Sequence, residues 1–289
     1  MKSARSTLTT RLRAIALGGA AVGLSQLALF GGSAQALTVV DKMLFLSTDV
    51  SGSIDAAEYD TQRLGWSNAF LSPTIKSYIA AAPNGIAVAV GQWDTDAYAP
   101  TSTFPYDVPQ AIAWTHLTNS ASVDSFAAQL ATMVRQGSGL TCVSCGITAA
   151  VASIQNAIST GLFDSAVKII DISSDGIENV TDDATVQAAR DNAASQGISI
   201  NALAIEGDYG PTGVSDFYTA NAITPGGFVK TVTGFTDDEF EAAATIKLER
   251  EVNGVPGPLP VFGAIAAFGW AGRLRKRVSL AKGNLPAMA

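Results

Sequence analysis

The sequence predicts an α/β fold: one doubly wound, mostly parallel six-stranded sheet with helices on both faces. Between residues 37 and 253, short apolar runs alternate with longer stretches of helical periodicity, and this alternation favours parallel strands joined by helices. Hydrophobic residues make up 47% of the 289-residue chain and charged residues 15%, a composition typical of a chain that folds around a core. No internal repeat or low-complexity run divides the region, so we expect a single domain there.

The first predicted strand, residues 43–48, is a continuous apolar run that ends at Asp49, as expected for a strand covered on both faces. A helix is predicted at residues 55–71, with Trp66 and Phe70 among its apolar positions. The other predicted elements follow in chain order: strands at 86–93 and 98–104, helices at 123–134 and 147–158, a strand at 167–172, a helix at 182–195, a strand at 198–205, a short helix at 216–222, a strand at 227–231 and a final helix at 236–250. In such sheets, ligands lie at the carboxyl ends of the strands.

Residues 1–36 have the layout of a signal peptide. A basic start precedes an apolar run at residues 14–30, and Ala34-Gln35-Ala36 fits the small-x-small cleavage rule. The mature chain is therefore predicted to begin at Leu37. We expect it to be exported to a compartment in which disulfides can form. An uncleaved membrane anchor is the alternative.

Residues 254–289 form a second predicted targeting segment. A proline-rich motif, residues 255–260, precedes a short apolar stretch at 261–272 and a basic cluster at 273–277. This layout resembles the PEP-CTERM sorting signals read by exosortases, which implies a transient membrane hold and a processing enzyme that releases or anchors the protein at the cell surface. The segment departs from those signals in two ways: it lacks a Pro-Glu-Pro motif, and a tail at residues 279–289 follows the basic cluster. A plain membrane anchor is the alternative.

The charge distribution excludes some classes of partner and site. The two terminal segments hold nine basic residues and no acids, so the part between them has nine basic and 25 acidic residues, a net charge of −16. Such a body repels nucleic acid and attracts cations, although solubility explains the charge equally well. His116 is the only histidine, which excludes a multi-histidine zinc or iron site, and no recognisable motif partners it in a Ser-His-Asp triad.

Oxygen-bearing side chains follow the first predicted strand as Asp49-Val50-Ser51-Gly52-Ser53. A loop leaving the strand can turn the side chains of Asp49, Ser51 and Ser53 toward one point, and Gly52 allows a close backbone approach. A carboxylate with two hydroxyls suits Mg²⁺, Mn²⁺ or Ca²⁺. The simpler interpretation is that Ser53 or Asp55 caps the following helix.

This motif resembles the first element of the metal-ion-dependent adhesion site (MIDAS) of von Willebrand factor type A (vWA) domains, the integrin I-like domains. Gly139-Leu140-Thr141 resembles the loop that carries that family's metal-binding Thr. Ser174-Asp175-Gly176 resembles its Thr-Asp-Gly strand end, with Ser174 in place of the usual Thr. The resemblance covers about residues 41–250 and implies a Rossmann-like vWA fold. It is greatest to a bacterial subfamily of unknown function, through residues 51–59, 170–176 and 201–205.

The resemblance implies a role for each residue. Ser51, Ser53 and Thr141 would give oxygens directly to the ion, while Asp49 and Asp175 would bind it directly or through water. The last coordination position would take an acidic group of a protein partner. We therefore expect an exported metal-dependent binding or adhesion module at the cell surface, in the outer envelope or secreted, with Mg²⁺ as cofactor, or Mn²⁺ or Ca²⁺.

Several alternatives stay open at this point. The domain could be structural, with a non-functional metal site, or a metal-dependent hydrolase. We expect no enzyme, because no phosphate-binding Gly-rich loop or Gly-x-Ser-x-Gly elbow is present and Ser51 stands where a haloacid dehalogenase-type phosphotransferase needs a second Asp. Ser144 could replace Thr141 at the metal.

Weaker candidates lie around these motifs. Cys142 and Cys145 are expected to form a small disulfide, with a redox pair or free thiols as alternatives. Asp94 and Asp96 could line the rim of the site, or they are ordinary turn residues. Asp182 and Asp183 are expected to form a charged helix start. Trp66 and Trp93 are expected to lie in the core.

Overall fold

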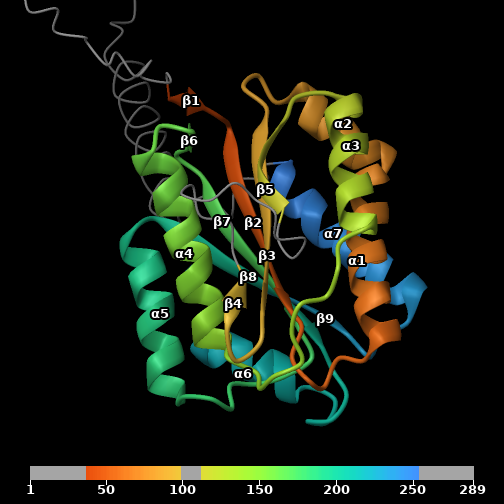
Figure 1. Cartoon of the computed structure of the whole chain (residues 1–289), viewed down its shortest axis with the longest axis vertical. Helices are drawn as coiled ribbons and strands as arrows, with labels where there is room; N and C mark the ends of the chain where they lie inside the picture. Colours follow the sequence, from red (N-terminus) through yellow and green to blue (C-terminus); the bar gives the residue numbers. More distant parts are fainter. Residues whose placement is uncertain (1–36, 99–111, 254–289) are drawn as a thin grey trace, which may run out of the picture. The chain divides into compact units, whose positions relative to one another are not determined.

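The computed structural model describes residues 37–98 and 112–253 (Figure 1). The predicted signal peptide, residues 1–36, and the predicted sorting segment, residues 254–289, lie outside the described residues. Within the described part, no helix is long and apolar enough to cross a membrane.

The main sheet is built around β2 (Lys42–Asp49), which pairs in parallel with β3 (Ile86–Trp93) on one side and β7 (Lys168–Ser174) on the other. Beyond β7, the strands β8 (Ile198–Ile205) and β9 (Val229–Val232) continue the parallel order. The five parallel strands therefore end at one edge, the lower edge in Figure 1. The predicted doubly wound α/β fold is confirmed.

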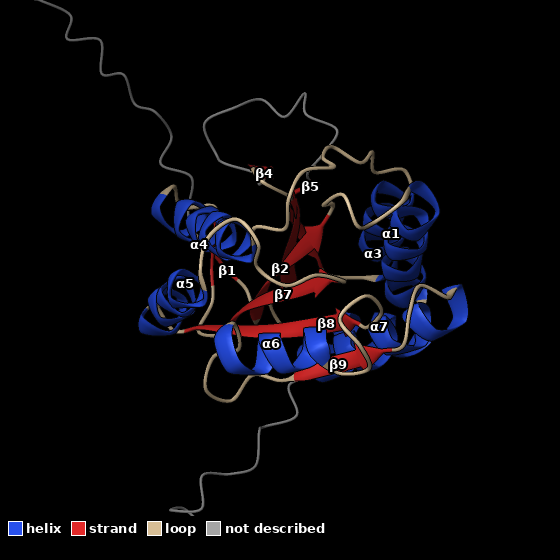
Figure 2. Ribbon diagram, turned by 90° about the horizontal axis from the view of Figure 1, so that it is seen from below, coloured by secondary structure: helices blue, strands red, loops and turns tan. Residues whose placement is uncertain are grey.

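Seven helices in the described residues cover the two faces. One face carries α1 (Ala56–Leu71), α2 (Pro73–Ala81), α3 (Ser120–Ala131) and α7 (Asp237–Val252), and the other carries α4 (Val143–Ser159), α5 (Asp183–Ser195) and α6 (Gly213–Asn221). Figure 2 looks onto the carboxyl edge and shows α4 and α5 on the opposite side of the strands from α1 and α3. Because α1 follows β2 on one face and α5 follows β7 on the other, the ends of these neighbouring strands form the switch point at which ligands bind in sheets of this kind.

Four elements were not predicted from the sequence: three strands and one helix. Strand β5 (Ile112–Leu117) pairs antiparallel with β3, beside the two-residue β4 (Ala97–Tyr98), so the main sheet of the described residues has seven strands. The predicted strand at 98–104 is described only at Tyr98, since residues 99–111 lie outside the described part. A further short pair joins β1 (Thr38–Val39) to β6 (Phe163–Asp164). The fourth missed element is α2, which starts at Pro73, one residue after α1 ends, and buries Ile75 and Ile79.

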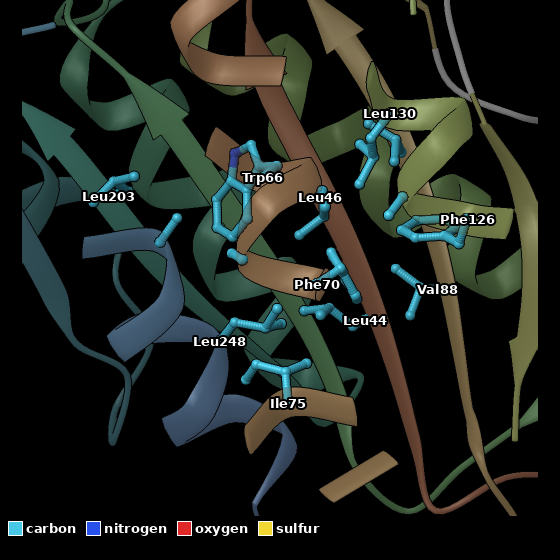
Figure 3. Packing of buried hydrophobic residues seen from close by; sticks show 14 of the residues in the cluster. Leu44, Leu46, Trp66, Phe70, Ile75, Val88, Phe126, Leu130, Leu203 and Leu248 are labelled. Atoms are coloured by element: carbon cyan, nitrogen blue, oxygen red, sulfur yellow. The ribbon is translucent and has the colours of Figure 1, made fainter. Parts of the chain in front are cut away.

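Two hydrophobic clusters fill the space between the sheet and its helices. On the α1 face, Trp66 and Phe70 pack over Leu44 and Leu46 of β2 (Figure 3). On the α4 face, Trp93 packs within the second cluster. Trp66 is 2% exposed and Trp93 1%, so the prediction that both are core residues is confirmed. This packing holds the strand ends, and therefore the loops that follow them, in fixed positions.

Candidate metal centre

The ends of the two central strands are joined by the carboxylate of Asp49, the last residue of β2. Asp49 is fully buried. Its Oδ1 accepts a hydrogen bond of 2.7 Å from the backbone N–H of Ser51, and its Oδ2 accepts one of 2.6 Å from the hydroxyl of Ser174, the last residue of β7. Ser174 stands where the resembling family usually has Thr, and the hydroxyl makes the contact here.

The predicted site residues form one connected cluster. Ser51 Oγ lies 3.3 Å from Ser53 Oγ and 3.2 Å from Thr141 Oγ1. Ser53 Oγ donates to Asp175 Oδ1 at 2.8 Å. Together with the contact between Asp49 and Ser51, these bonds bring all five predicted residues together from three loops at the carboxyl edge of the sheet.

Thr141, rather than Ser144, belongs to the cluster. The backbone of Thr141 is held on both sides by Asn179, whose Oδ1 accepts from Thr141 N–H at 2.8 Å and whose N–H donates to the Thr141 carbonyl at 3.0 Å. A Cβ at Gly176 would lie 3.0 Å from the Thr141 side chain, so glycine permits this close approach. Ser144 Oγ instead lies 3.2 Å from Thr181 Oγ1, so the alternative that placed it in the cluster is not supported.

Asp55, not Ser53, caps α1. Its Oδ1 accepts from the N–H groups of Ala57 and Glu58, and the Glu58 carboxylate accepts in return from the Asp55 N–H. This reciprocal pair is a capping box. The Ser53 hydroxyl takes no part in this cap and contacts Asp175 instead.

Two residues that sequence reasoning did not place in the site hold its loops. Asp94 is buried, and its carboxylate accepts from the N–H groups of Ser138, Gly139 and Asp96 at 3.0, 2.8 and 2.9 Å. The bond to the Asp96 N–H is that of the turn residue expected from the sequence, whereas the anchoring of the loop before Thr141 was not expected. Arg135 Nη2 donates to the carbonyls of Val50 and Ser51 at 3.1 and 2.8 Å. No local pattern in the sequence signals this role, because the partners lie more than 80 positions away.

Cys142 and Cys145 form the predicted disulfide, directly after Thr141. Cys142 is the N-cap of α4, and its Sγ accepts from the Cys145 N–H at 3.3 Å. Asp182 caps α5 by accepting from the Thr185 N–H at 2.9 Å, which confirms the predicted charged helix start. His116 lies elsewhere, with its Nε2 2.8 Å from the Asn84 carbonyl.

The electrostatics of the cluster favour a cation. Burial, together with the negative charge of Asp175, raises the pKa of Asp49 to about 7 against the opposing effect of the Ser174 hydrogen bond. Burial also raises the pKa of Asp175, with added repulsion from Glu58 and Asp208. A positive charge between these two carboxylates would stabilise their ionised forms, which burial disfavours.

The donor set fits a hard divalent ion. Two carboxylates and three hydroxyls supply only oxygen, which Mg²⁺, Mn²⁺ and Ca²⁺ prefer. Side-chain oxygen pairs in the cluster are separated by 2.8 to 3.3 Å, comparable with the edge of about 3 Å in an octahedron of oxygens around Mg²⁺. Across residues 37–98 and 112–253, no group of three or more His, Cys, Asp or Glu side chains gathers to hold a metal, so this hydroxyl-rich cluster is a different kind of site.

The family described as "Protein of unknown function (DUF1194)" matches residues 39–256. No curated protein sequence matches the chain. Proximal thread matrix protein 1 from the mussel byssus, in its second crystal form, is similar in structure, with 17% identity, 74% of this chain and 49% of that chain covered, and a TM-score of 0.51.

Two bacterial pilus proteins are also similar in structure. The pilus adhesin SpaC from Lactobacillus rhamnosus GG has 14% identity, 75% and 30% coverage, and a TM-score of 0.51. The vWF domain of the type V pili tip protein Mfa5 from Porphyromonas gingivalis has 10% identity, 76% and 98% coverage, and a TM-score of 0.48. The chain spans about half or less of the length of the mussel protein and of SpaC, and at these identities the likeness concerns the fold alone.

Proposed function

We propose that this chain, which belongs to the DUF1194 family of unknown function, is a vWA-type module that binds a partner through a divalent cation. The observation that carries the proposal is the cluster at the carboxyl edge of the sheet. There, Ser51 Oγ lies within 3.3 Å of two other hydroxyls, and the fully buried carboxylate of Asp49 lies behind them.

The proposed ligand roles are those implied by the resemblance to the metal-ion-dependent adhesion site. Ser51, Ser53 and Thr141 would give hydroxyl oxygens, while Asp49 and Asp175 would bind directly or through water and balance the charge. Mg²⁺ is the proposed ion, with Mn²⁺ and Ca²⁺ compatible with the same oxygens. With few charged ligands, the bound ion would supply an electrophilic position for an acidic group of a protein partner. Ser53 is exposed and Asp175 half-buried, so a partner would approach from their side.

The setting proposed for this activity is outside the cytoplasm. The signal-peptide and sorting-signal patterns at residues 1–36 and 254–289 support an exported protein at the cell surface, in the outer envelope or secreted. An exosortase-type enzyme would process it, with transient or permanent membrane attachment through the C-terminal segment. SpaC is described as a pilus adhesin and proximal thread matrix protein 1 as having a zinc occupied MIDAS motif. Those are properties of those proteins, and this chain's own residues carry the proposal. The acidic body disfavours nucleic acid.

Binding rather than catalysis is proposed. The single histidine, His116, contacts the Asn84 carbonyl and lies outside the cluster. A structural domain is the second candidate, because the five side chains already satisfy one another through hydrogen bonds.

Isothermal titration of the purified chain with MgCl₂ and with MnCl₂ tests the proposal. We expect one ion per chain, at least about 100-fold weaker binding in Asp49→Ala and in Ser51→Ala, and unchanged binding in the control Asp183→Asn, an exposed carboxylate on α5. Binding by wild type and Asp49→Ala alike would contradict the proposed site. A pull-down of envelope proteins with Mg²⁺ and with chelator then tests partner binding, and identical captures would favour the structural domain.

A further inference from the structure

The hydroxyl of Tyr218 is buried without a hydrogen-bond partner among the described residues. The side chain is 0% exposed, and its oxygen is one of a few buried side-chain atoms in that part of the chain that lack a partner. Buried hydroxyls nearly always find a partner, so an orphan in a native fold calls for an explanation. Apart from Tyr218 and the Nε of Arg135, the buried atoms without a partner belong to strands β2, β3 and β7 and to helices α1 and α7.

Helix α6 aims this side chain toward the strand ends. Its first turn is fixed by Glu206, whose carboxylate accepts from the N–H groups of Val214 and Ser215 at 3.0 and 2.9 Å. Tyr218 follows Val214 by one turn, and both are fully buried. Residues four apart lie on the same helix face, and Val214 and Tyr218 both belong to the buried cluster that contains Ile172 of β7, two positions before Ser174.

Charge effects on Tyr218 identify its neighbours. Its pKa is raised, first by burial and next by the negative charge of Asp49, with smaller contributions from Asp175 and Glu178. The Ser174 side chain is close enough to the Tyr218 hydroxyl to interact with it and oppose the shift, although the two groups do not form a hydrogen bond of normal geometry. The orphan hydroxyl is therefore adjacent to the pair of side chains that joins β2 to β7.

The Asp49–Ser174 pair has room for one more donor. The two oxygens of a carboxylate can accept about four hydrogen bonds, and Asp49 accepts two, from the Ser51 N–H and the Ser174 hydroxyl. Ser174 Oγ accepts from the Gly176 N–H at 3.1 Å while donating its only proton to Asp49. The pair therefore has acceptor capacity left for the Tyr218 hydroxyl.

We propose that Tyr218 is a positioning residue of the metal centre, and that its hydroxyl donates a hydrogen bond to the Asp49–Ser174 pair when the cluster holds a cation. This inference rests on the function proposed above. It explains why a tyrosine, and not a phenylalanine, occupies this fully buried place. Outer groups of this kind orient metal ligands, and their loss commonly weakens metal binding by 10-fold or more.

The substitution Tyr218→Phe removes the hydroxyl and keeps the ring. We expect two effects of opposite direction. Binding of Mg²⁺ and Mn²⁺, measured by titration of the full chain, weakens by about 10-fold. The melting temperature in chelator stays the same or rises, because a buried polar atom without a partner has been removed. A purely structural tyrosine would not produce this combination.

Tyr59→Phe is the matched control. Tyr59 is also buried, at 4% exposed, but its hydroxyl donates to the Met133 carbonyl and accepts from Gln92 Nε2. We expect this variant to lower the melting temperature and to leave cation binding within twofold of wild type. The ultraviolet difference spectrum on adding Mg²⁺ gives a second readout, since the shift of one tyrosine should be present in wild type and absent in Tyr218→Phe.

The outcomes separate this inference from the proposed function. If wild type binds the ion and Tyr218→Phe binds it equally well, the role of Tyr218 is wrong and the metal centre stands. If wild type binds neither ion, the proposed function and the inference fail together. Weaker binding in Tyr218→Phe with an unchanged or raised melting temperature in chelator supports both.

Discussion

The carboxylate of Asp49 couples two properties of the molecule, its stability and its affinity for a cation, to pH. Burial raises its pKa from 3.8 to about 7, so between these values the folded state binds a proton that the unfolded state releases. The contribution of Asp49 to the free energy of unfolding is therefore greatest below about pH 4 and falls as the pH rises through this window. A difference of about three pKa units corresponds to on the order of 4 kcal/mol.

We predict that the chain in chelator loses stability between pH 5 and pH 8, and that added Mg²⁺ restores more of it at pH 8. The reason is that the cation and the proton compete for Asp49, so cation affinity rises with pH through about 7. Thermal melting at both pH values, with Mg²⁺ and with chelator, measures this.

Asp49→Asn provides the comparison, because it keeps the shape and removes the ionisation. Other buried carboxyls also contribute to the pH dependence, so the informative quantity is the difference between wild type and Asp49→Asn. If that difference is the same at pH 5 and pH 8, the shifted ionisation of Asp49 is refuted.

Single residues were predictable from the sequence where their role depends on a short motif. Asp49, Ser51 and Ser53 come together because a loop leaving a strand turns alternate side chains toward one point. The role of Ser174 was only partly visible, since its contact with Asp49 crosses 125 positions. Arg135 was not visible at all, because nothing near it in the chain indicates that its partners are the carbonyls of Val50 and Ser51.

At the scale of elements, the start of α4 carries both the disulfide and the residue that precedes it, Thr141. The disulfide joins Cys142 to Cys145, three positions apart, and so closes a very short loop. Thr141 has its own attachment, through two hydrogen bonds to Asn179. The position of Thr141 therefore has a support that does not depend on the disulfide.

We predict that the double variant Cys142→Ser with Cys145→Ser unfolds with a free energy lower by about 2 kcal/mol, the loop-closure contribution for so short a loop. Cation affinity should change by less than about threefold, because Asn179 still holds Thr141. Urea unfolding and titration with MgCl₂ measure the two quantities. A 10-fold loss of affinity would mean that the disulfide is part of the metal centre after all.

Elements with a strong internal pattern were predicted well, and those defined by their neighbours were not. The predicted boundaries of β3 and β8 agree with the structure because each strand is rich in apolar residues along its length. Strand β5 is only half-buried over most of its length, so its pattern was too weak to detect. Helix α2 was hidden because it follows α1 after a single residue, Ser72.

At the scale of the whole molecule, a buried charge cluster fastens α7 to the sheet. Lys247 Nζ lies 2.5 Å from Asp171 Oδ1 of β7 and 2.7 Å from Glu251 Oε1, and none of the three side chains is more than 1% exposed. Asn201 of β8 donates to the same Glu251 oxygen at 2.7 Å. Burial raises the pKa of Asp171 well above its usual range, and the Glu251 carboxylate raises it further.

We predict that Lys247→Met lowers the free energy of unfolding by about 3–5 kcal/mol, because it leaves two carboxyl groups buried without their cation. The loss should be smaller at pH 5 than at pH 8, since the raised pKa of Asp171 means that protonation relieves the repulsion. Adding Asp171→Asn should recover part of the loss. Urea unfolding at both pH values provides the measurement, and a loss independent of pH would point to packing alone.

The sequence by itself determined the alternation of strands and helices, the apolar faces that form the core, and the strand ends at which the oxygen-bearing side chains lie. These features depend on the local period of apolar residues and on short motifs, which one stretch of chain carries alone. Only the tertiary structure decided which distant groups meet: Thr141 rather than Ser144 in the cluster, Tyr218 beside Ser174, and Lys247 between two carboxylates. Such contacts depend on how whole elements pack against one another, and packing distances are not encoded in the pattern of any single element.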